Sequence, residues 1–171
     1  LGDGSVYLLY IGGDVLGQKT FISQKLNSRF LYKEISKNKY AVYSWIQFDD
    51  EVKGYDKATK TVMNIPGYID GHKIEVIAEE FTRGCIGVSK VTIPNTVTEI
   101  KRGAFVYTKR IQSISISSSV KTIAADVFSG NNCLKFTVDS NNKYFQAING
   151  DLYSKDGKTL VSATGSSMTK I

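Results

Sequence analysis

The sequence predicts a mainly β protein built as a solenoid, in which the short strands of successive coils stack into a parallel sheet. Three observations lead to this prediction. Apolar residues recur at a spacing of 23 residues, apolar and polar residues alternate within the recurring segments, and pairs containing glycine separate some of those segments. One short strand cannot bury its apolar face alone, so neighbouring coils have to cover one another.

The repeat is clearest in two segments that begin at Val91 and Ile114. Five pairs of apolar residues match at an offset of 23 residues: Val91/Ile114, Ile93/Ile116, Val97/Val120, Ile100/Ile123 and Phe105/Phe128. The same frame extends backward to Phe81 and forward, with an offset of 22 residues, to Phe136. We therefore expect about three coils of about 23 residues within residues 61–143. Phe81, Phe105 and Phe128 should stack inside them as an aromatic ladder.

Residues 1–60 do not follow the period and are predicted to form a non-repeat, β-rich N-terminal cap, because solenoid ends need a cover over their exposed core. Tyr40 to Phe48 alternates as a strand does. Residues 52–55 and 61–65 have the pattern of a hairpin. Residues 20–36 are ambiguous, since their apolar positions fit a helix face as well as a strand.

Residues 144–171 are predicted to hold a terminal hairpin and the start of a further, truncated segment. Two turn pairs, Asn149-Gly150 and Asp156-Gly157, lie between alternating residues. The second pair should be a two-residue loop that joins residues 152–153 to residues 160–161. The chain begins with Leu1 and ends within what reads as a continuing pattern, so we expect it to be a piece of a longer protein.

The composition excludes several classes of protein. The 171 residues are 42% hydrophobic and 22% charged, close to the globular average, which excludes disorder, collagen and a small disulfide scaffold. The longest apolar stretch, residues 6–16, is interrupted by glycines and an aspartate and is too short for a membrane span. The net charge of +6 is dispersed along the chain, so specific nucleic-acid binding is not expected.

Several motifs resemble the BspA-type leucine-rich repeat family. The string Ile-Pro-x-x-Val-x-x-Ile-x-x-x-Ala-Phe stands at residues 93–105, residues 64–81 look like an opening coil, and residues 138–160 are similar to a spacer hairpin. The resemblance covers about residues 55–162. It implies a right-handed leucine-rich-repeat solenoid in a secreted or cell-surface protein, of the kind generally taken as an adhesion or protein-binding module.

The family usually has a buried cysteine three residues after the phenylalanine, and this sequence departs from that spacing. Cys85 follows Phe81 by four residues, and Cys133 follows Phe128 by five. The two cysteines belong to coils two steps apart, about 9.6 Å at the usual strand spacing, whereas bridged Cα atoms usually lie within about 7 Å. We therefore expect two free thiols.

No catalytic, metal or cofactor site is expected. His72 is the single histidine and follows an Asp-Gly turn, and the two cysteines lack the Cys-x-x-Cys spacing of metal sites. The acidic pairs at residues 49–50 and 79–80 have the context of solvated turns. We accordingly predict that the segment is not an enzyme.

The outward side of the predicted strands carries the candidate binding residues. These side chains are polar and mostly short: Asn64, Lys90, Thr92, Gln112, Ser113, Ser115, Lys135 and Thr137. A second candidate is a basic patch of residues predicted to lie at turns: Lys101, Arg102, Lys109 and Arg110. The alternative for both sets is plain solvation of the surface.

Taken together, these patterns predict a monomeric binding or adhesion module. The resemblance implies a secreted or cell-surface location, and the expected partner is a protein or glycan of a host or neighbouring cell. Two alternatives remain open at this point: a structural spacer within a larger surface protein, and a weak binder of polyanions or glycans.

Overall fold

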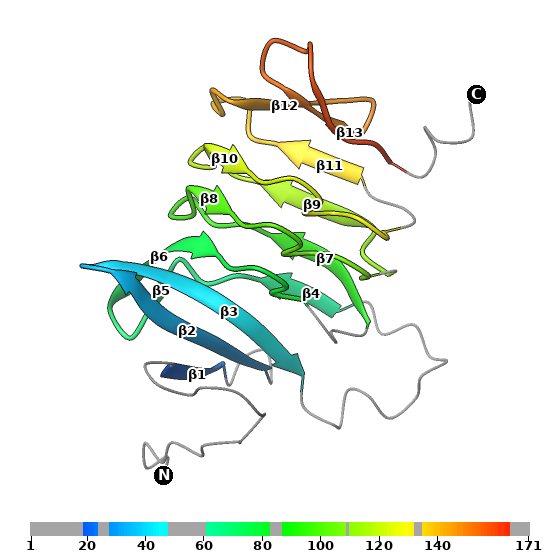
Figure 1. The fold of residues 1–171 in the computed structure, drawn as a ribbon. Helices are drawn as coiled ribbons and strands as arrows, with labels where there is room; N and C mark the ends of the chain where they lie inside the picture. Colours follow the sequence, from blue (N-terminus) through cyan, green and yellow to red (C-terminus); the bar gives the residue numbers. More distant parts are fainter. Residues whose placement is uncertain are drawn as a thin grey trace.

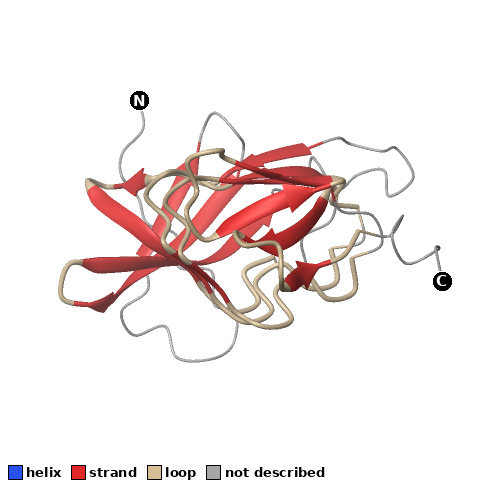
Figure 2. Ribbon diagram, turned by 90° about the horizontal axis from the view of Figure 1, so that it is seen from above, coloured by secondary structure: helices blue, strands red, loops and turns tan. Residues whose placement is uncertain are grey.

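The computed structural model describes residues 19–23, 28–47, 61–82, 87–108, 110–131 and 135–164. Within these residues the protein is mainly β, as predicted, and contains no helix (Figure 2). The strands form two columns that run up the molecule, with a separate small sheet at one end (Figure 1).

One column is a four-stranded parallel sheet with the order β11-β9-β7-β4. Its strands are β4 (Thr61–Asn64), β7 (Val88–Thr92), β9 (Ser113–Ile116) and β11 (Lys135–Val138). Val91 pairs with Ile114, and Ile114 pairs with Phe136. The offsets of 23 and 22 residues read from the sequence are therefore the registers of β7, β9 and β11, whereas β4 pairs with β7 at an offset of 28 residues.

The second column continues into the N-terminal strands, giving the order β1-β2-β3-β6-β8-β10, with β5 paired to β6. Its strands are β1 (Lys19–Ser23), β2 (Ser28–Ser36), β3 (Lys39–Gln47), β5 (Tyr68–Ile69), β6 (His72–Ile77), β8 (Glu99–Ile100) and β10 (Thr122–Ile123). Ile77, Ile100 and Ile123 pair in turn across β6, β8 and β10, which are parallel. Both columns therefore repeat the same offset.

The core lies between the two columns and contains the predicted phenylalanine ladder. Phe81 and Phe105 are fully buried, and Phe128 is nearly so. The ring centroids of Phe81 and Phe105 lie 6.0 Å apart with an edge-to-face geometry, and those of Phe105 and Phe128 lie 5.9 Å apart and stacked. Phe30 extends the ladder at one end, at 6.4 Å from Phe81, and Phe136 at the other, at 4.8 Å from Phe128.

The helix alternative for residues 20–36 is wrong, because residues 19–23 and 28–36 are the strands β1 and β2. In β2, Phe30 and Tyr32 are buried whereas Leu31 and Lys33 are partly exposed. This period of two matches a strand that packs one face on a core. The antiparallel partners β1 and β3 supply the hydrogen bonds on both sides of β2.

The N-terminal strands join the repeats through β3. This strand agrees with the predicted strand over residues 40–47, and it pairs in parallel with β6, where Tyr40 lies opposite Ile74 and Val42 opposite Ile77. The predicted hairpin of residues 52–55 with 61–65 lies partly outside the described residues. Its second half is β4, which pairs in parallel with β7.

The predicted hairpin that joins residues 152–153 to residues 160–161 is confirmed, but its two-residue loop at Asp156-Gly157 is wrong. A two-residue loop occurs instead at Asn149-Gly150. The third sheet consists of β12 (Phe145–Ile148), β13 (Asp151–Ser154) and β14 (Leu160–Ser162). Asn149 and Gly150 have φ angles of 54° and 93° between the paired residues Ile148 and Asp151, which suits a type I′ turn.

Five residues, 155–159, lie between β13 and β14, and four of them, 155–158, form the loop that the hydrogen bond between Ser154 and Thr159 closes. The amide of Ser154 donates a hydrogen bond to the carbonyl of Thr159, at 2.9 Å. Inside the loop, the Asp156 carboxylate accepts hydrogen bonds from the Ser154 hydroxyl at 2.6 Å and from the Lys158 amide at 3.1 Å. These hydrogen bonds favour this loop over the predicted two-residue loop.

Two polar side chains, the buried Thr108 and the partly buried Asn131, tie the turns of neighbouring repeats together. Thr108 and Asn131 occupy the positions three residues after Phe105 and Phe128. The Thr108 hydroxyl donates to the Phe105 carbonyl at 2.8 Å, and the Asn131 amide donates to the carbonyls of Phe105 and Phe128. A turn carbonyl is thus satisfied by a polar side chain. Cys85 and Cys133 lie outside the described residues.

Replacing Phe105 by alanine should cost about 3–5 kcal/mol of unfolding free energy, the range for a buried aromatic residue. The reason is that Phe105 contacts the ring on each side of it in the ladder. Urea unfolding followed by circular dichroism would measure the change. Tyr68→Ala is the control, because that side chain is 62% exposed. A loss below about 1 kcal/mol for Phe105→Ala would contradict the stacked ladder.

Tyr32→Phe should lower stability by about 1–3 kcal/mol at pH 7, because it removes the hydrogen bond from the Tyr32 hydroxyl to the Asp70 carboxylate. Burial, and secondly that bond, raise the pKa of Tyr32 above its ordinary value of 10.0. The unfolded chain therefore ionises first, so this contribution is complete below pH 10 and falls as the pH rises further.

The test is urea unfolding of both proteins between pH 7 and pH 11. The difference between wild type and Tyr32→Phe should shrink above pH 10, while Tyr144→Phe, at a side chain that is 45% exposed, should follow the wild type throughout. A constant difference across the range would show that Tyr32 ionises equally in the folded and unfolded states.

Candidate binding surface

The outward face of the four-stranded sheet carries two polar rows that run across the strands. In one row Asn64, Thr92, Ser115 and Thr137 are successive partners on β4, β7, β9 and β11. In the other row the successive partners are Val62, Lys90, Ser113 and Lys135. We call these two rows the polar strip. The alternation of the strands places both rows on one face, opposite the buried Met63, Val91, Ile114 and Phe136.

Gln112 lies beside the polar strip. It immediately precedes β9, its side chain is exposed, and its main-chain amide donates to the carbonyl of Ser89 at 2.8 Å. The structure thus brings seven of the eight predicted sheet-face residues into two adjacent rows and places Gln112 at their edge.

The lysines of the polar strip are exposed and carry no partner within the part of the chain that the structure describes. Lys90 and Lys135 make neither an ion pair nor a side-chain hydrogen bond to a described residue. In the neighbouring row the hydroxyl of Thr137 donates to that of Ser115 at 3.0 Å. The strip therefore combines two available cations with hydroxyls that can still exchange hydrogen bonds.

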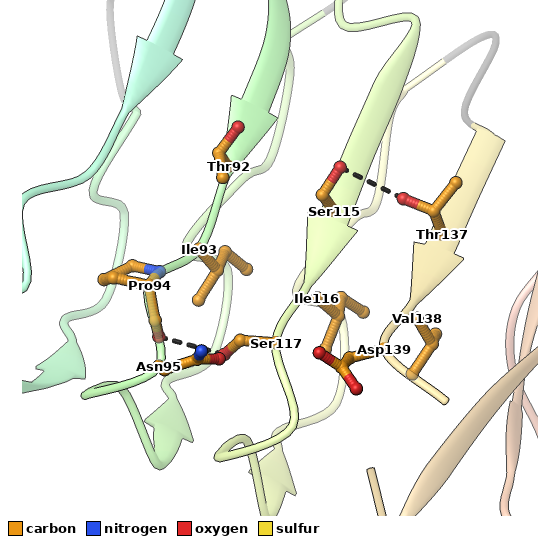
Figure 3. A pocket seen from close by; sticks show the side chains of 10 residues that line it. All are labelled: Thr92, Ile93, Pro94, Asn95, Ser115, Ile116, Ser117, Thr137, Val138 and Asp139. Carbon is orange, nitrogen blue, oxygen red and sulfur yellow. Dashed lines mark hydrogen bonds between the residues drawn. The ribbon is translucent and has the colours of Figure 1, made fainter. Parts of the chain in front are cut away.

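A groove adjoins the polar strip at the carboxyl ends of β7, β9 and β11 (Figure 3). It is an open cavity of about 470 Å³. Three kinds of side chain line it: the strip residues Thr92, Ser115 and Thr137, the aliphatic Ile93, Ile116 and Val138, and the loop residues Pro94, Asn95, Ser117 and Asp139.

Seven lining residues of the groove were not among the predicted site residues: the aliphatic Ile93, Ile116 and Val138 and the loop residues Pro94, Asn95, Ser117 and Asp139. For Pro94, Ser117 and Asp139 the repeat frame contains a signal that would have found them. Pro94 and Ser117 are 23 residues apart, and Ser117 and Asp139 are 22 apart. Ser117 and Asp139 directly follow the ends of β9 and β11, and Pro94 lies two residues after the end of β7. All three therefore extend the stacked order of the strands into the loops.

Hydrogen bonds within the loops and between neighbouring repeats hold the loops of the groove. The Ser117 hydroxyl donates to the Pro94 carbonyl at 2.9 Å, and Asp139 accepts the amide of Asn141 at 2.9 Å. The buried Asn142 side chain donates to the carbonyls of Ser117 and Val120 and accepts the amides of Tyr144 and Phe145. The loops that line the groove are therefore held in place by hydrogen bonds to the preceding repeat and to the residues that follow Asp139.

Comparison with known proteins assigns the repeats to a family. Residues 64–160 match a family described as "BspA type Leucine rich repeat region (6 copies)". The chain belongs to this family. A search of curated proteins gives no significant match.

Three solved structures are similar to this BspA-type chain. A leucine-rich cell surface protein of Faecalibacterium prausnitzii shares 26% identity and a TM-score of 0.50 over 60% of this chain. The pneumococcal vaccine antigen PcpA shares 14% identity and a TM-score of 0.40 over 85% of this chain. A leucine-rich repeat protein of Eubacterium ventriosum shares 20% identity and a TM-score of 0.33 over 86% of this chain. The chain spans 26%, 56% and 51% of their respective lengths.

The predicted basic patch differs from the polar strip because its described members are engaged. Lys101 pairs with Glu99 at 2.5 Å, and Arg102 pairs with Asp126 at 3.7 Å. Arg110 is exposed and also has an interaction partner, whereas Lys109 lies outside the described residues. The hydrogen bond from Lys101 lowers the pKa of Glu99 and raises that of Lys101. Paired in this way, Lys101 and Arg102 present less net charge to an anionic ligand.

The lone histidine of the BspA-type chain packs as a structural residue. The ring of His72 stacks on that of Tyr40, with centroids 4.2 Å apart, and lies 6.4 Å from Tyr32. Among the described residues, no cluster of three or more His, Cys, Asp or Glu side chains could hold a metal ion. The same part of the chain has no helix long and apolar enough to cross a membrane.

Glu99→Gln should reduce stability by at most about 1 kcal/mol at pH 7, because Glu99 pairs with Lys101 and Lys39 at a partly exposed position. The lowered pKa of Glu99 means that its contribution is complete above pH 4.5 and is lost as the pH falls through the folded-state pKa. A double-mutant cycle at pH 7 and at pH 3 measures the coupling energy between Glu99 and Lys101, and so shows whether the contribution of Glu99 is lost at low pH.

The cycle uses Glu99→Gln and Lys101→Gln, with Lys121→Gln in place of Lys101→Gln as the control. We expect coupling between Glu99 and Lys101 at pH 7, none at pH 3, and none with Lys121 at either pH. Equal coupling at both values of pH would contradict an ionic interaction.

Proposed function

We propose that this chain is a non-catalytic binding or adhesion module of a secreted or cell-surface protein. The observation that carries the proposal is the polar strip, in which the exposed Lys90 and Lys135 lack partners among the described residues and adjoin a groove of about 470 Å³. A BspA-type family match and a likeness to a protein described as a cell surface protein support it. The comparisons found a repeat family and no enzyme family.

The proposal includes an architecture that presents the strip. The two columns of strands are the two sides of a right-handed solenoid with about three coils of about 23 residues over residues 61–143. Residues 1–60 form its N-terminal cap, and residues 144–171 hold the terminal hairpin and the start of a further segment. The pairing of β3 with β6 and the stacking of Phe30 on Phe81 support the role of the cap.

The proposed partner is a protein or glycan on a host or neighbouring cell, which a monomeric chain would bind through the polar strip. The strip extends across four strands of one sheet. Because these strands are parallel and in regular register, they hold the side chains of the strip at fixed spacing. Such preorganisation lowers the entropic cost of binding.

The double variant Lys90→Glu/Lys135→Glu should weaken binding of the chain to its target surface at least tenfold, because it replaces both available cations of the strip by anions. The measurement is biolayer interferometry of the 171-residue chain on a panel of epithelial cell membranes and extracellular-matrix proteins. The matched control is Lys143→Glu/Lys158→Glu, which makes the same charge change at two exposed lysines outside the strip.

A spacer segment gives the opposite result. It would show no specific binding to any surface of the panel, or binding that both double variants leave unchanged. An equal loss in both double variants would indicate a general charge effect in place of a site on the sheet face.

A further inference from the structure

We propose that the polar strip and its groove bind an anionic polysaccharide that carries a carboxylate on every second sugar. The inference rests on the proposed binding function and names the chemical class of its ligand. It follows from the pairing of the strands, the chemistry of the lining and the spacing of the two lysines.

The main chain of the sheet face is not available to a ligand. Strand β9 pairs with β7 on one side and β11 on the other, and β7 pairs with β4 and β9. Their amides and carbonyls are thus used within the sheet, and an extended peptide on this face could not add a strand to it. Recognition has to come from side chains, which favours a ligand rich in its own hydrogen-bonding groups.

The side chains of the groove match the two kinds of surface that a pyranose offers. Hydroxyls of Thr92, Ser115 and Thr137 both donate and accept, as sugar hydroxyls do. Beside this hydroxyl row, the partly exposed Val138 can contact the C–H groups of a sugar ring, whereas Ile93 and Ile116 are buried and form the floor beneath it.

Hydrogen-bond direction within the groove fits the same ligand. Thr137 donates to Ser115, which leaves the Ser115 hydrogen free to point toward a ligand. On the loop side, the carboxylate of Asp139 is an acceptor and takes one amide, from Asn141, at 2.9 Å. Its remaining lone pairs can accept hydrogen bonds from the hydroxyls of a neutral sugar.

The spacing of the lysines sets the charge pattern. Lys90 and Lys135 are both partners of Ser113, from opposite sides, so they stand two strand spacings apart, about 9.6 Å between their Cα atoms. A sugar in a β-linked chain advances by close to one strand spacing. A polysaccharide that crosses the strands therefore places two sugars in that interval, with a neutral sugar over Ser113 and a carboxylated sugar beside each lysine.

The test uses an octasaccharide of alternating glucuronate and N-acetylglucosamine, titrated into the 171-residue chain by isothermal calorimetry. Three further probes separate the contributions: the same octasaccharide with its carboxyls reduced to alcohols, an oligouronate with a carboxylate on every sugar, and oligoglutamate of equal charge. The alternating octasaccharide should bind at least tenfold more tightly than each of the other three.

Two sets of variants locate the site. Lys90→Gln/Lys135→Gln should reduce affinity for the octasaccharide at least tenfold, and the matched Lys143→Gln/Lys158→Gln should leave it unchanged. Thr92→Val/Thr137→Val, which removes two hydroxyls at constant shape and charge, should reduce affinity severalfold. Circular dichroism of each variant confirms that it is folded.

Binding of oligoglutamate or of the fully charged oligouronate as tight as that of the alternating octasaccharide would overturn the proposal, as would the absence of octasaccharide binding. If either result accompanies a loss of surface binding by Lys90→Glu/Lys135→Glu, the ligand class is wrong and the binding function stands. If instead Lys90→Glu/Lys135→Glu binds the target surface as tightly as the wild type does, the proposed function itself fails.

Discussion

Parallel pairing of successive repeats at a constant register is the interaction on which the rest of the structure depends. Each step of 22 or 23 residues brings a residue onto its counterpart in the previous repeat. An apolar residue at one position therefore becomes a ladder inside, as for Phe81, Phe105 and Phe128, and a polar residue becomes a row outside. The core and the candidate binding face are thus two consequences of one register.

The same stacking leaves an exposed core at each end, which has to be covered. At the N-terminal end β3 supplies the next partner of β6, and the rings of Phe30 and Phe81 continue the ladder. The hydrogen bond between Tyr32 and Asp70 then fixes the antiparallel strands to the turn before β6. At the other end, Asn142 uses both ends of its amide to join the last repeat to the terminal hairpin.

The repeat frame could be predicted from the sequence because each anchor residue is constrained by its counterparts in neighbouring repeats. The strand character of residues 28–36 could not, since Phe30 and Tyr32 are selected by packing on the repeats and not by a local pattern. Likewise the loop of residues 155–158 depends on one side chain, Asp156, whose hydrogen bonds favour a wider turn. The rows of the strip, and the positions of Pro94, Ser117 and Asp139, could be predicted from the repeat frame. The groove could not, because its shape depends on the conformation of the loops that line it.

The two groups of basic residues show why charge alone does not locate a binding surface. Lys101 and Arg102 look as available in the sequence as Lys90 and Lys135, but carboxylates lie beside them: Glu99 two residues from Lys101, and Asp126 in the following repeat beside Arg102. The row that contains Lys90 and Lys135 instead has the hydroxyl of Ser113 between them and no carboxylate. A ligand at the strip need not displace an internal partner, so the full attraction of each lysine remains for binding.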